Sequence, residues 1–591
     1  METTMHAHSL HRSLLLSFTL LICACSGGGG GEATTPGLPP IDGSTGGSSG
    51  SGGGATETPA APSEKEASRF LTQSTFGATD TSIQALQEIG YENWITEEYS
   101  KSIVSHLDRV QSRYIAEDED FGNINSLHFD SFWESAVFGD DQLRQRAVFA
   151  LSQIMVISKE PRQIGKLAPA SVPDYMDILQ EHAFGNYRDL LEAVTYSYAM
   201  SQYLTYFRNE KADPETGRMP DENYAREIMQ LFTIGTVELQ KNGEPRLGGG
   251  GEFIELYDNE DITGLAKVFT GLSWQGGRFQ VKASAEPGYK KKPLKMFDDF
   301  HSMEEKSFLG TTIAAGTGGK ESIRIALDAL FNHDNAPPFI SKQLIQRFVT
   351  ANPSPEYVER VANVFESGTF TGPGGTTYGD GQRGDLKAIW AAILLDTEAR
   401  DVSRTSDPSF GKIREPVIRF AHWARNLVPI ENAPRSNSSM RNANQTSNLS
   451  QQAFHSPSVF NFYRPGYVAS GYPSAAQNLV NPEMQITFES SMVGYFDLMQ
   501  DQIARTARAD GYNPDYSDVI SMADDPDLLI NHFDRLLTNG VLQDDTRARI
   551  KAAIETTPIE IGADNEQSSR AERVKTALLW FVSSPEFMVQ K

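Results

Sequence analysis

Hydrophobic side chains recur every three or four positions along most of the chain after residue 63. Stripes of this kind are expected when a helix buries one face. The clearest examples are Ile83, Leu86 and Ile89; Leu143, Ala147, Ala150, Leu151 and Ile154; Leu344, Ile345 and Phe348; Val358, Val361, Ala362 and Phe365; and Leu386, Ile389, Ala392 and Ile393. Strand-like alternation is scarce, and residues 278–283 are its best and short example. The pattern predicts a mainly α-helical protein with little β-structure.

The chain before residue 63 has a different composition. Residues 26–62 are rich in Gly, Ser, Thr, Pro and Ala and contain almost no large apolar side chain. Because such a segment cannot bury enough apolar surface to fold, it is predicted to be a disordered linker. Ser63 and Glu66 then have the spacing of a capping box, which predicts the start of the first helix. Glycine-rich stretches at 247–251, 316–319 and 367–384 lie between periodic segments and are predicted to be long loops.

The first residues resemble an export signal. Residues 14–24 form an apolar run behind Arg12 that is too short to span a bilayer but has the length of a signal-peptide core. The run ends in ICAC at 22–25, which resembles the lipobox of bacterial lipoproteins, where the cysteine is lipidated. The alternative is an ordinary cleaved signal with a chance cysteine. We expect a lipoprotein-type signal peptide at 1–24, lipidation of Cys25, and a place in the cell envelope, as an outer-membrane lipoprotein or otherwise periplasmic or secreted.

These boundaries predict three parts: the signal at 1–24, the linker at 25–62, and one large helical region at 63–591 that can be divided near residue 480. Both cysteines lie in or beside the signal, so the helical region has no disulfide and no thiolate metal site. The net charge of −25 disfavours nucleic acids and anionic lipid head groups as partners. No apolar run long enough to span a membrane follows Cys25, so the lipid is the only membrane anchor we expect.

Residues 219–235, MPDENYAREIMQLFTIG, are the most distinctive stretch of the chain. They predict a helix over 221–234 that ends at Gly235. Its apolar stripe consists of Tyr224, Ile228, Leu231 and Phe232, and its neighbouring polar stripe consists of Asn223, Arg226, Glu227 and Gln230. A polar stripe beside an apolar one is typical either of a buried hydrogen-bond network or of the wall of a binding site. The sequence leaves both interpretations open.

Several further motifs recur in a known order along the chain. They are RFL at 69–71, TFGAT at 75–79, LRQRAVFALSQ at 143–153, Asp261 with FTGLSW at 269–274, His301 with Lys306 and LG at 309–310, FISKQL at 339–344, GDL at 384–386, DTEAR at 396–400, REP at 414–416 and SPEF at 584–587. With residues 219–235 they make the chain resemble the bacterial "domain of unknown function 1800" family over nearly all of 65–591.

The resemblance implies an exported, mostly helical bacterial protein without an established activity. Relatives are often encoded beside a second exported family, "domain of unknown function 1501", which resembles sulfatases; the resemblance therefore implies such a protein as a partner. Some relatives carry a Trp-His-x-His-Phe cluster after the Leu-Arg-x-Arg helix. This chain has FALSQ at 149–153 instead, so a metal role built on those histidines is not expected here.

Two acidic clusters are candidates for chemistry. Residues 258–261, DNED, precede a predicted helix at 262–271, where they can form an N-cap or, through Asp258 and Asp261, bind a divalent cation. Asp298, Asp299, His301 and Lys306 can supply an acid/base pair or belong to a solvated loop. A segment with Phe460, Phe462, Tyr463, Tyr467 and Tyr472 can stack on sugar rings or on a peptide, or pack an irregular loop.

Three functions fit these features. The first, which we expect, is an envelope-anchored protein that binds or assembles with an extracellular macromolecule at the cell surface. The second is an extracellular hydrolase in which Arg226, Glu227, Asp261 and His301 meet in one cleft, with a divalent cation as the only cofactor considered. The third is an accessory protein for the sulfatase-like partner. Independently of the function, we expect the helix at 221–234 to pack on the helix at 261–271, with a buried Arg226 bridging Glu227 and Asp261 inside the protein.

Overall fold

The computed structural model describes residues 61–117, 126–159, 170–275, 278–280, 292–434, 439–505, 508, 511–562 and 564–591. The predicted signal peptide, Cys25 and almost all of the predicted linker lie outside these residues. Residues 59–591 form one compact unit. No helix in the described ranges combines the length and the apolar character needed to cross a membrane.

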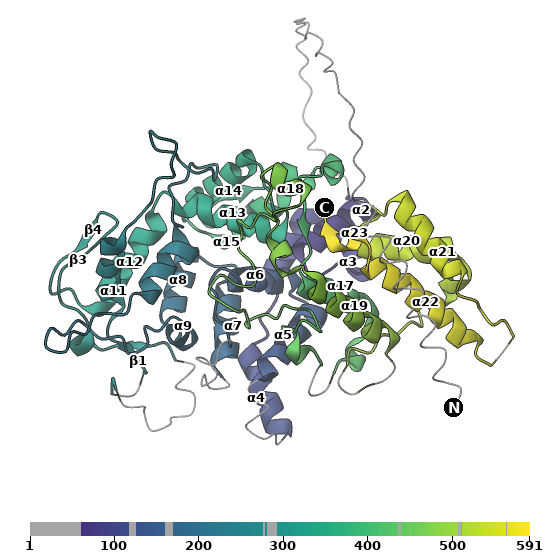
Figure 1. Ribbon diagram of the computed structural model, residues 1–591, viewed down its shortest axis with the longest axis horizontal. Coiled ribbons are helices and arrows are strands. Elements are labelled where there is room, and N and C mark those ends of the chain that lie inside the picture. The colour runs from purple at the N-terminus through teal and green to yellow at the C-terminus, as the bar shows by residue number, and fades with distance from the viewer. Residues whose placement is uncertain are drawn as a thin grey trace, which may run out of the picture. The chain divides into compact units, whose positions relative to one another are not determined.

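Helices dominate the described residues, which confirms the predicted mainly α-helical fold (Figure 1). The α-helices are α2 Glu64–Ser74, α3 Asp80–Ser100, α4 His106–Glu117, α5 Leu127–Phe138, α6 Gln142–Ser152, α7 Ser171–His182, α8 Tyr187–Thr195, α9 Tyr198–Tyr203, α10 Asn223–Glu227, α11 Asn259–Ala266, α12 Gly319–Asn332, α13 Ala336–Phe348, α14 Pro355–Ser367, α15 Leu386–Leu395, α16 Thr397–Arg400, α17 Pro416–Leu427, α18 Pro473–Ala476, α19 Glu489–Ala504, α20 Pro526–Leu537, α21 Asp544–Glu555, α22 Glu566–Val582 and α23 Pro585–Met588. A π-helix, η2, spans Ile228–Thr233, and short 3₁₀-helices are η3 Lys267–Phe269, η5 Asp298–Phe300, η6 Val402–Ser406, η7 Ile430–Asn432, η8 Ser439–Asn442, η9 Pro482–Ile486 and η10 Ile520–Asp524.

The strands of the described ranges are short and pair as antiparallel two-stranded sheets. They are β1 Leu272–Ser273 with β2 Lys295–Met296, β3 Lys306–Phe308 with β4 Thr311–Ile313, β5 Phe370–Thr371 with β6 Thr377–Tyr378, and β7 Lys412–Ile413 with β8 Val589–Gln590. The predicted alternation at 278–283 is not seen as one of these strands: Phe279 and Gln280 lie in a turn, and residues 281–283 lie outside the described ranges.

Local signals in the sequence set several helix boundaries. The predicted capping box at the start of α2 is present: Ser63 Oγ accepts from Glu66 N, and Glu66 Oε2 accepts from Ser63 N at 2.9 Å. The stripe that ends at Gly90 lies in the first half of α3, where Gly90 has φ of 77° and interrupts the helix. A positive φ is easily adopted only by glycine, so this residue separates two helical segments.

The helices with the clearest apolar stripes form the centre of the core. α13 packs on α14, and α14 packs on α15. The indole of Trp390 in α15 is fully buried, and its Nε1 donates to the carbonyl of Ala183 at 2.9 Å. The stripes therefore marked the buried faces correctly, because burial of one helix face is what produces the 3.6-residue period.

The two ends of the compact unit contact each other. In Figure 1, α2 in purple lies beside the yellow helices of the C-terminal part. Ser68 Oγ donates to Asn539 Oδ1 at 2.9 Å, and Arg69 Nε donates to the carbonyl of Lys591 at 3.0 Å. Strand β8, near the last residue, pairs with β7, which lies more than 170 residues earlier in the sequence. The C-terminal residues are thereby part of the same core that supports β7.

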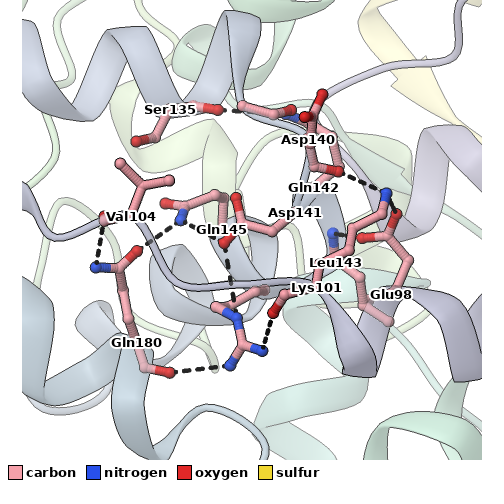
Figure 2. A network of polar contacts seen from close by, with 12 residues as sticks. Glu98, Lys101, Val104, Ser135, Asp140, Asp141, Gln142, Leu143, Gln145 and Gln180 are labelled. Carbon is pink, nitrogen blue, oxygen red and sulfur yellow. Dashed lines mark hydrogen bonds and ion pairs between the residues drawn. The ribbon is translucent and has the colours of Figure 1, made fainter.

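Polar side chains at the start of α6 form a dense network (Figure 2). Glu98 accepts from Leu143 N at 2.9 Å, and the Arg144 guanidinium donates to the carbonyls of Lys101 and Gln180, both at 3.2 Å. Gln145 Nε2 donates to Gln180 Oε1 at 2.7 Å. These polar residues of the LRQR segment join α3, α6 and α7, so their role is structural.

Candidate functional site

Glu227 lies at the end of α10 in a polar, buried setting. It is 7% exposed, and its Oε2 is buried without a hydrogen-bond partner. Burial raises the pKa of Glu227, and the nearby Arg226 opposes this only in part. Burial, with a smaller contribution from the Glu227 charge, also raises the pKa of Tyr257 to about 12 and that of Tyr203. Of the predicted site residues, Glu227 is the one whose setting suits an acid.

Arg226 does not make the predicted buried bridge. Its side chain is 42% exposed and forms an ion pair with Glu222, one turn earlier, at 3.5 Å. The expectation of a buried Arg226 is therefore wrong. The predicted packing of the two helices is present, since α10 contacts α11 and Thr263 Oγ1 donates to Glu222 Oε1 at 3.0 Å.

Asp258 and Asp261 form the N-terminal cap of α11. Asp258 Oδ1 accepts from the backbone N of Glu260 at 2.7 Å and of Asp261 at 3.2 Å, and Asp261 Oδ2 accepts from Asp258 N at 3.1 Å. Asp261 Oδ1 accepts from Leu309 N at 2.6 Å, which ties the helix to the β3–β4 turn. Of the two interpretations of residues 258–261, the structure therefore shows the helix cap. Within the described ranges, no group of three or more His, Cys, Asp or Glu residues is placed to hold a metal ion.

His301 is fully buried and serves the packing around α12. Its Nδ1 lies 2.9 Å from the carbonyl oxygen of Thr270, and its Nε2 lies 3.3 Å from Ser322 Oγ. Burial lowers its pKa. Asp298 Oδ1 accepts from Gly319 N at 2.9 Å at the start of α12, and burial lowers the pKa of Lys306 to about 8. Asp261 and His301 are each engaged in hydrogen bonds that hold neighbouring elements together, whereas Glu227 is not.

The distinctive segment at 219–235 contains a feature that its sequence did not reveal. After α10 the chain continues as the π-helix η2, in which Thr233 Oγ1 donates to the carbonyl of Ile228 at 2.6 Å. π-Helical turns are rare and frequently lie at functional sites. Gln230 and Leu231, both in η2, line a groove at the surface.

This groove has a volume of about 560 Å³. Its central wall is one face of α13 together with residues 351–353. One outer wall consists of η2 and residues 235–245. The other consists of residues 465–466 and 478–480, which precede and follow α18 in the sequence (α13 and α18 are labelled in Figure 1). Side chains of the central wall form hydrogen bonds with the backbone of both outer walls. Lys342 Nζ donates to the carbonyl of Gly243 at 3.2 Å, and Asn352 exchanges two hydrogen bonds with Val480, at 2.8 and 3.0 Å. We call this cavity the α13 groove.

A set of buried charges, which we call the ionic cluster, includes one residue of the same helix, Arg347. It consists of Arg146, Arg347, Lys412, Glu415 and Glu483. Lys412 Nζ lies 3.1 Å from Glu483 Oε1 and 3.8 Å from Glu415 Oε1, and it also donates to the carbonyl of Arg347 at 3.2 Å. Three cations face two carboxylates, so the cluster has a net charge of +1 when all five groups are ionised.

Amide side chains complete the ionic cluster. Gln153 and Gln451 both donate to Glu415 Oε2, and Arg146 donates to the carbonyl of Arg347. Tyr463, from the aromatic segment, is buried nearby, and burial together with the Glu415 charge raises its pKa. The cluster and the α13 groove share two parts of the chain, because α13 carries both Arg347 and Gln346, and residues 463–466 carry both Tyr463 and Pro465.

The sequence reasoning missed both features. Two residues of the ionic cluster, Arg146 and Glu415, lie in the motifs LRQRAVFALSQ and REP, but neither motif indicates a contact with residues 347, 412 and 483. The one local signal is a set of charged residues inside strongly apolar stripes, as in Arg146 next to Ala147 and in Arg347 next to Phe348. Such residues are rarely buried without partners, and their partners lie far away in the sequence.

The comparisons with known proteins agree with the motif pattern. No curated protein and no solved structure matches the chain significantly. A family model described as "Protein of unknown function (DUF1800)" matches residues 69–589, a range that includes the α13 groove and the ionic cluster. The chain therefore belongs to the DUF1800 family.

Proposed function

We propose that this protein is an exported, envelope-anchored binding protein that holds an extracellular macromolecule in the α13 groove. The observation that carries the proposal is the groove itself, an open cavity of about 560 Å³ beside a π-helix, with walls joined by the side chains of Lys342 and Asn352. Concave sites of this size that combine apolar and polar lining are the usual places where proteins bind ligands. Binding needs no cofactor.

The anchor is the lipidated Cys25, and residues 26–62 are the tether. A prediction follows for radiolabelled palmitate: the wild-type chain is labelled in growing cells, and Cys25→Ala is not. Several acyl chains anchor firmly because each buried CH₂ contributes about 0.8 kcal/mol. In cell fractionation the wild type is expected with the envelope. Equal labelling of both chains, no labelling of either, or recovery of the wild type from the cytoplasm would contradict the anchor.

The occupant of the groove is either an extracellular polymer or an exported partner protein, for which a sulfatase-like DUF1501 protein is one candidate. A tethered protein that displays a groove suits either arrangement. The hydrolase alternative rests on Glu227 alone, since its buried carboxyl has a raised pKa while Asp261 and His301 are engaged in packing. We therefore place binding before catalysis.

Filling the groove tests the proposal. Thr236 lines it and is exposed, so Thr236→Trp puts a large ring into the cavity without entering the core. The full chain in detergent is mixed with purified insoluble envelope polymers and sedimented. We expect the bound fraction of Thr236→Trp to fall about tenfold, which is about 1.4 kcal/mol. Ser102→Trp, at an exposed position outside the groove, is the control and should bind as the wild type does. Equal binding by both variants would contradict a role of the groove.

A further inference from the structure

The α13 groove has an unusual lining for this chain. Five amide side chains line it, those of Gln230, Gln343, Gln346, Asn352 and Asn478. Among the described residues that line it, Lys342 is the only charged one, and its ammonium group donates to the carbonyl of Gly243. No carboxylate is among the described lining residues, although the whole chain has a net charge of −25.

A second cavity shows that this neutrality is a local property. It has a volume of about 800 Å³ and lies along α7 and α8, where Asp177, Glu181, Asp189 and Glu192 are among its lining residues. Several of its carboxylates are already used: Asp177 accepts from two backbone amides, and Glu192 pairs with Arg188 at 2.8 Å. The two cavities therefore differ in charge: the cavity along α7 and α8 is acidic like the chain as a whole, and the described lining of the α13 groove is not.

Gln343 gives the groove an unused donor. The residue is 8% exposed, and its Nε2 is buried without a hydrogen-bond partner in the protein. A buried amide N–H without a partner is unfavourable, so a ligand oxygen that accepts from it would be bound favourably. The amide of Gln346, by contrast, has a partner within the protein, because its Nε2 donates to the carbonyl of Ala351 at 2.9 Å.

Rings lie among these amides. Phe339, Pro353 and Pro465 line the groove and are partly exposed. Amide side chains both donate to and accept from hydroxyl groups, and the flat faces of aromatic and proline rings suit the C–H faces of sugars. Among the described lining residues, a charged polymer would find one ammonium group, that of Lys342, which already donates to Gly243, and no carboxylate. A peptide would be recognised by pairing with its backbone, for which the groove offers no regular strand edge among the described residues.

We propose that the α13 groove binds an uncharged polysaccharide, with its hydroxyl groups bound to the amides and its rings packed on Phe339 and the prolines. This inference deepens the proposed function and rests on it, since it names the class of macromolecule that the groove holds. Gln343 is the residue that we assign to direct contact with a sugar hydroxyl. It lies in α13, four residues before Arg347 of the ionic cluster.

Calorimetric titration of the full chain in detergent tests the proposal. The probes are neutral hexasaccharides of α-glucan, β-glucan, mannan and chitin type, with an anionic oligogalacturonate of the same length and a neutral hexapeptide as comparisons. We expect one neutral hexasaccharide to bind, and neither the oligogalacturonate nor the peptide. Gln343→Leu keeps the approximate size of the side chain and should weaken the sugar affinity about tenfold, since one hydrogen bond is worth about 1.4 kcal/mol in this range.

Matched variants separate the explanations. Gln567→Leu removes an exposed amide from α22, far from the lining, and should leave the affinity unchanged. Unchanged melting temperatures of both variants would show that they fold, and Thr236→Trp provides a second groove variant that leaves Gln343 in place. The proposal is overturned if no neutral hexasaccharide binds, if the anionic sugar or the peptide binds instead, or if Gln343→Leu and Gln567→Leu have equal effects. If, in addition, Thr236→Trp still sediments with envelope polymers, the proposed function fails as well; if it does not, only the sugar class is wrong.

Discussion

Replacing Lys412 with methionine is expected to destabilise the protein by about 3–5 kcal/mol, because the buried Glu483 carboxylate loses its ion-pair partner. Lys412 is 3% exposed, and its ammonium group lies 3.1 Å from Glu483 and 3.8 Å from Glu415. Without it, Glu415 and Glu483 keep the guanidinium charges of Arg146 and Arg347 but lose the ammonium group that they share. Urea denaturation followed by circular dichroism measures the loss.

A double variant and a pH series show whether the loss comes from charge. Lys412→Met with Glu483→Gln removes one charge of each sign, so it should recover much of the stability lost in Lys412→Met alone. Burial raises the pKa of Glu483 and Lys412 lowers it, so the pKa rises further in Lys412→Met. A carboxyl with a raised folded-state pKa stabilises the fold at low pH and loses this contribution as the pH rises through that pKa. The deficit of Lys412→Met should therefore be smaller at pH 5 than at pH 8, and an equal deficit at both would exclude this explanation.

Replacing Gly264 with alanine is expected to destabilise the protein by about 1–3 kcal/mol, the usual range for overpacking. A Cβ at this position in α11 would lie 1.8 Å from the carbonyl oxygen of Ser307, which belongs to the backbone of β3. The helix must then move away from the strand, and the hydrogen bond from Leu309 N to Asp261 must lengthen or break.

The sign of this effect is informative. In a helix interior alanine is normally more favourable than glycine by about 0.5–1 kcal/mol, so a loss of stability can come only from the close approach of the strand. Gly249 lies in a loop with open space around its Cβ position, and Gly249→Ala is the control. Thermal denaturation with hydrogen exchange of residues 306–313 is the measurement. A Gly264→Ala protein as stable as the wild type would show that α11 does not contact β3 so closely.

Much of the fold could be predicted from the sequence. The stripes of α13, α14 and α15, the capping box before α2 and the break at Gly90 were all visible as local patterns. They were visible because each depends on residues within one or two helical turns: a helix that buries one face repeats its apolar residues, and a cap lies three positions from its partner. The cap formed by Asp258 and Asp261 is also a local pattern, and it was one of the two interpretations that the sequence allowed for these residues.

The site was decided by the tertiary structure. The exposure of Arg226 depends on which side of α10 faces α11, and the π-helix after Glu227 changes the direction of every later side chain in that segment. The ionic cluster joins residues 146, 347, 412, 415 and 483, which no spacing rule connects. The same holds for the α13 groove, whose walls come from segments more than two hundred residues apart.

The sequence by itself therefore determined that the chain is mainly helical, where a few of the helices begin, and which faces of several helices are buried. Only the tertiary structure decided which buried polar groups become partners and where a ligand-sized groove forms on the surface. The physical reason is that hydrophobic burial is nondirectional and leaves a periodic trace in the sequence, whereas hydrogen bonds and ion pairs need one specific partner, which folding brings from any distance along the chain.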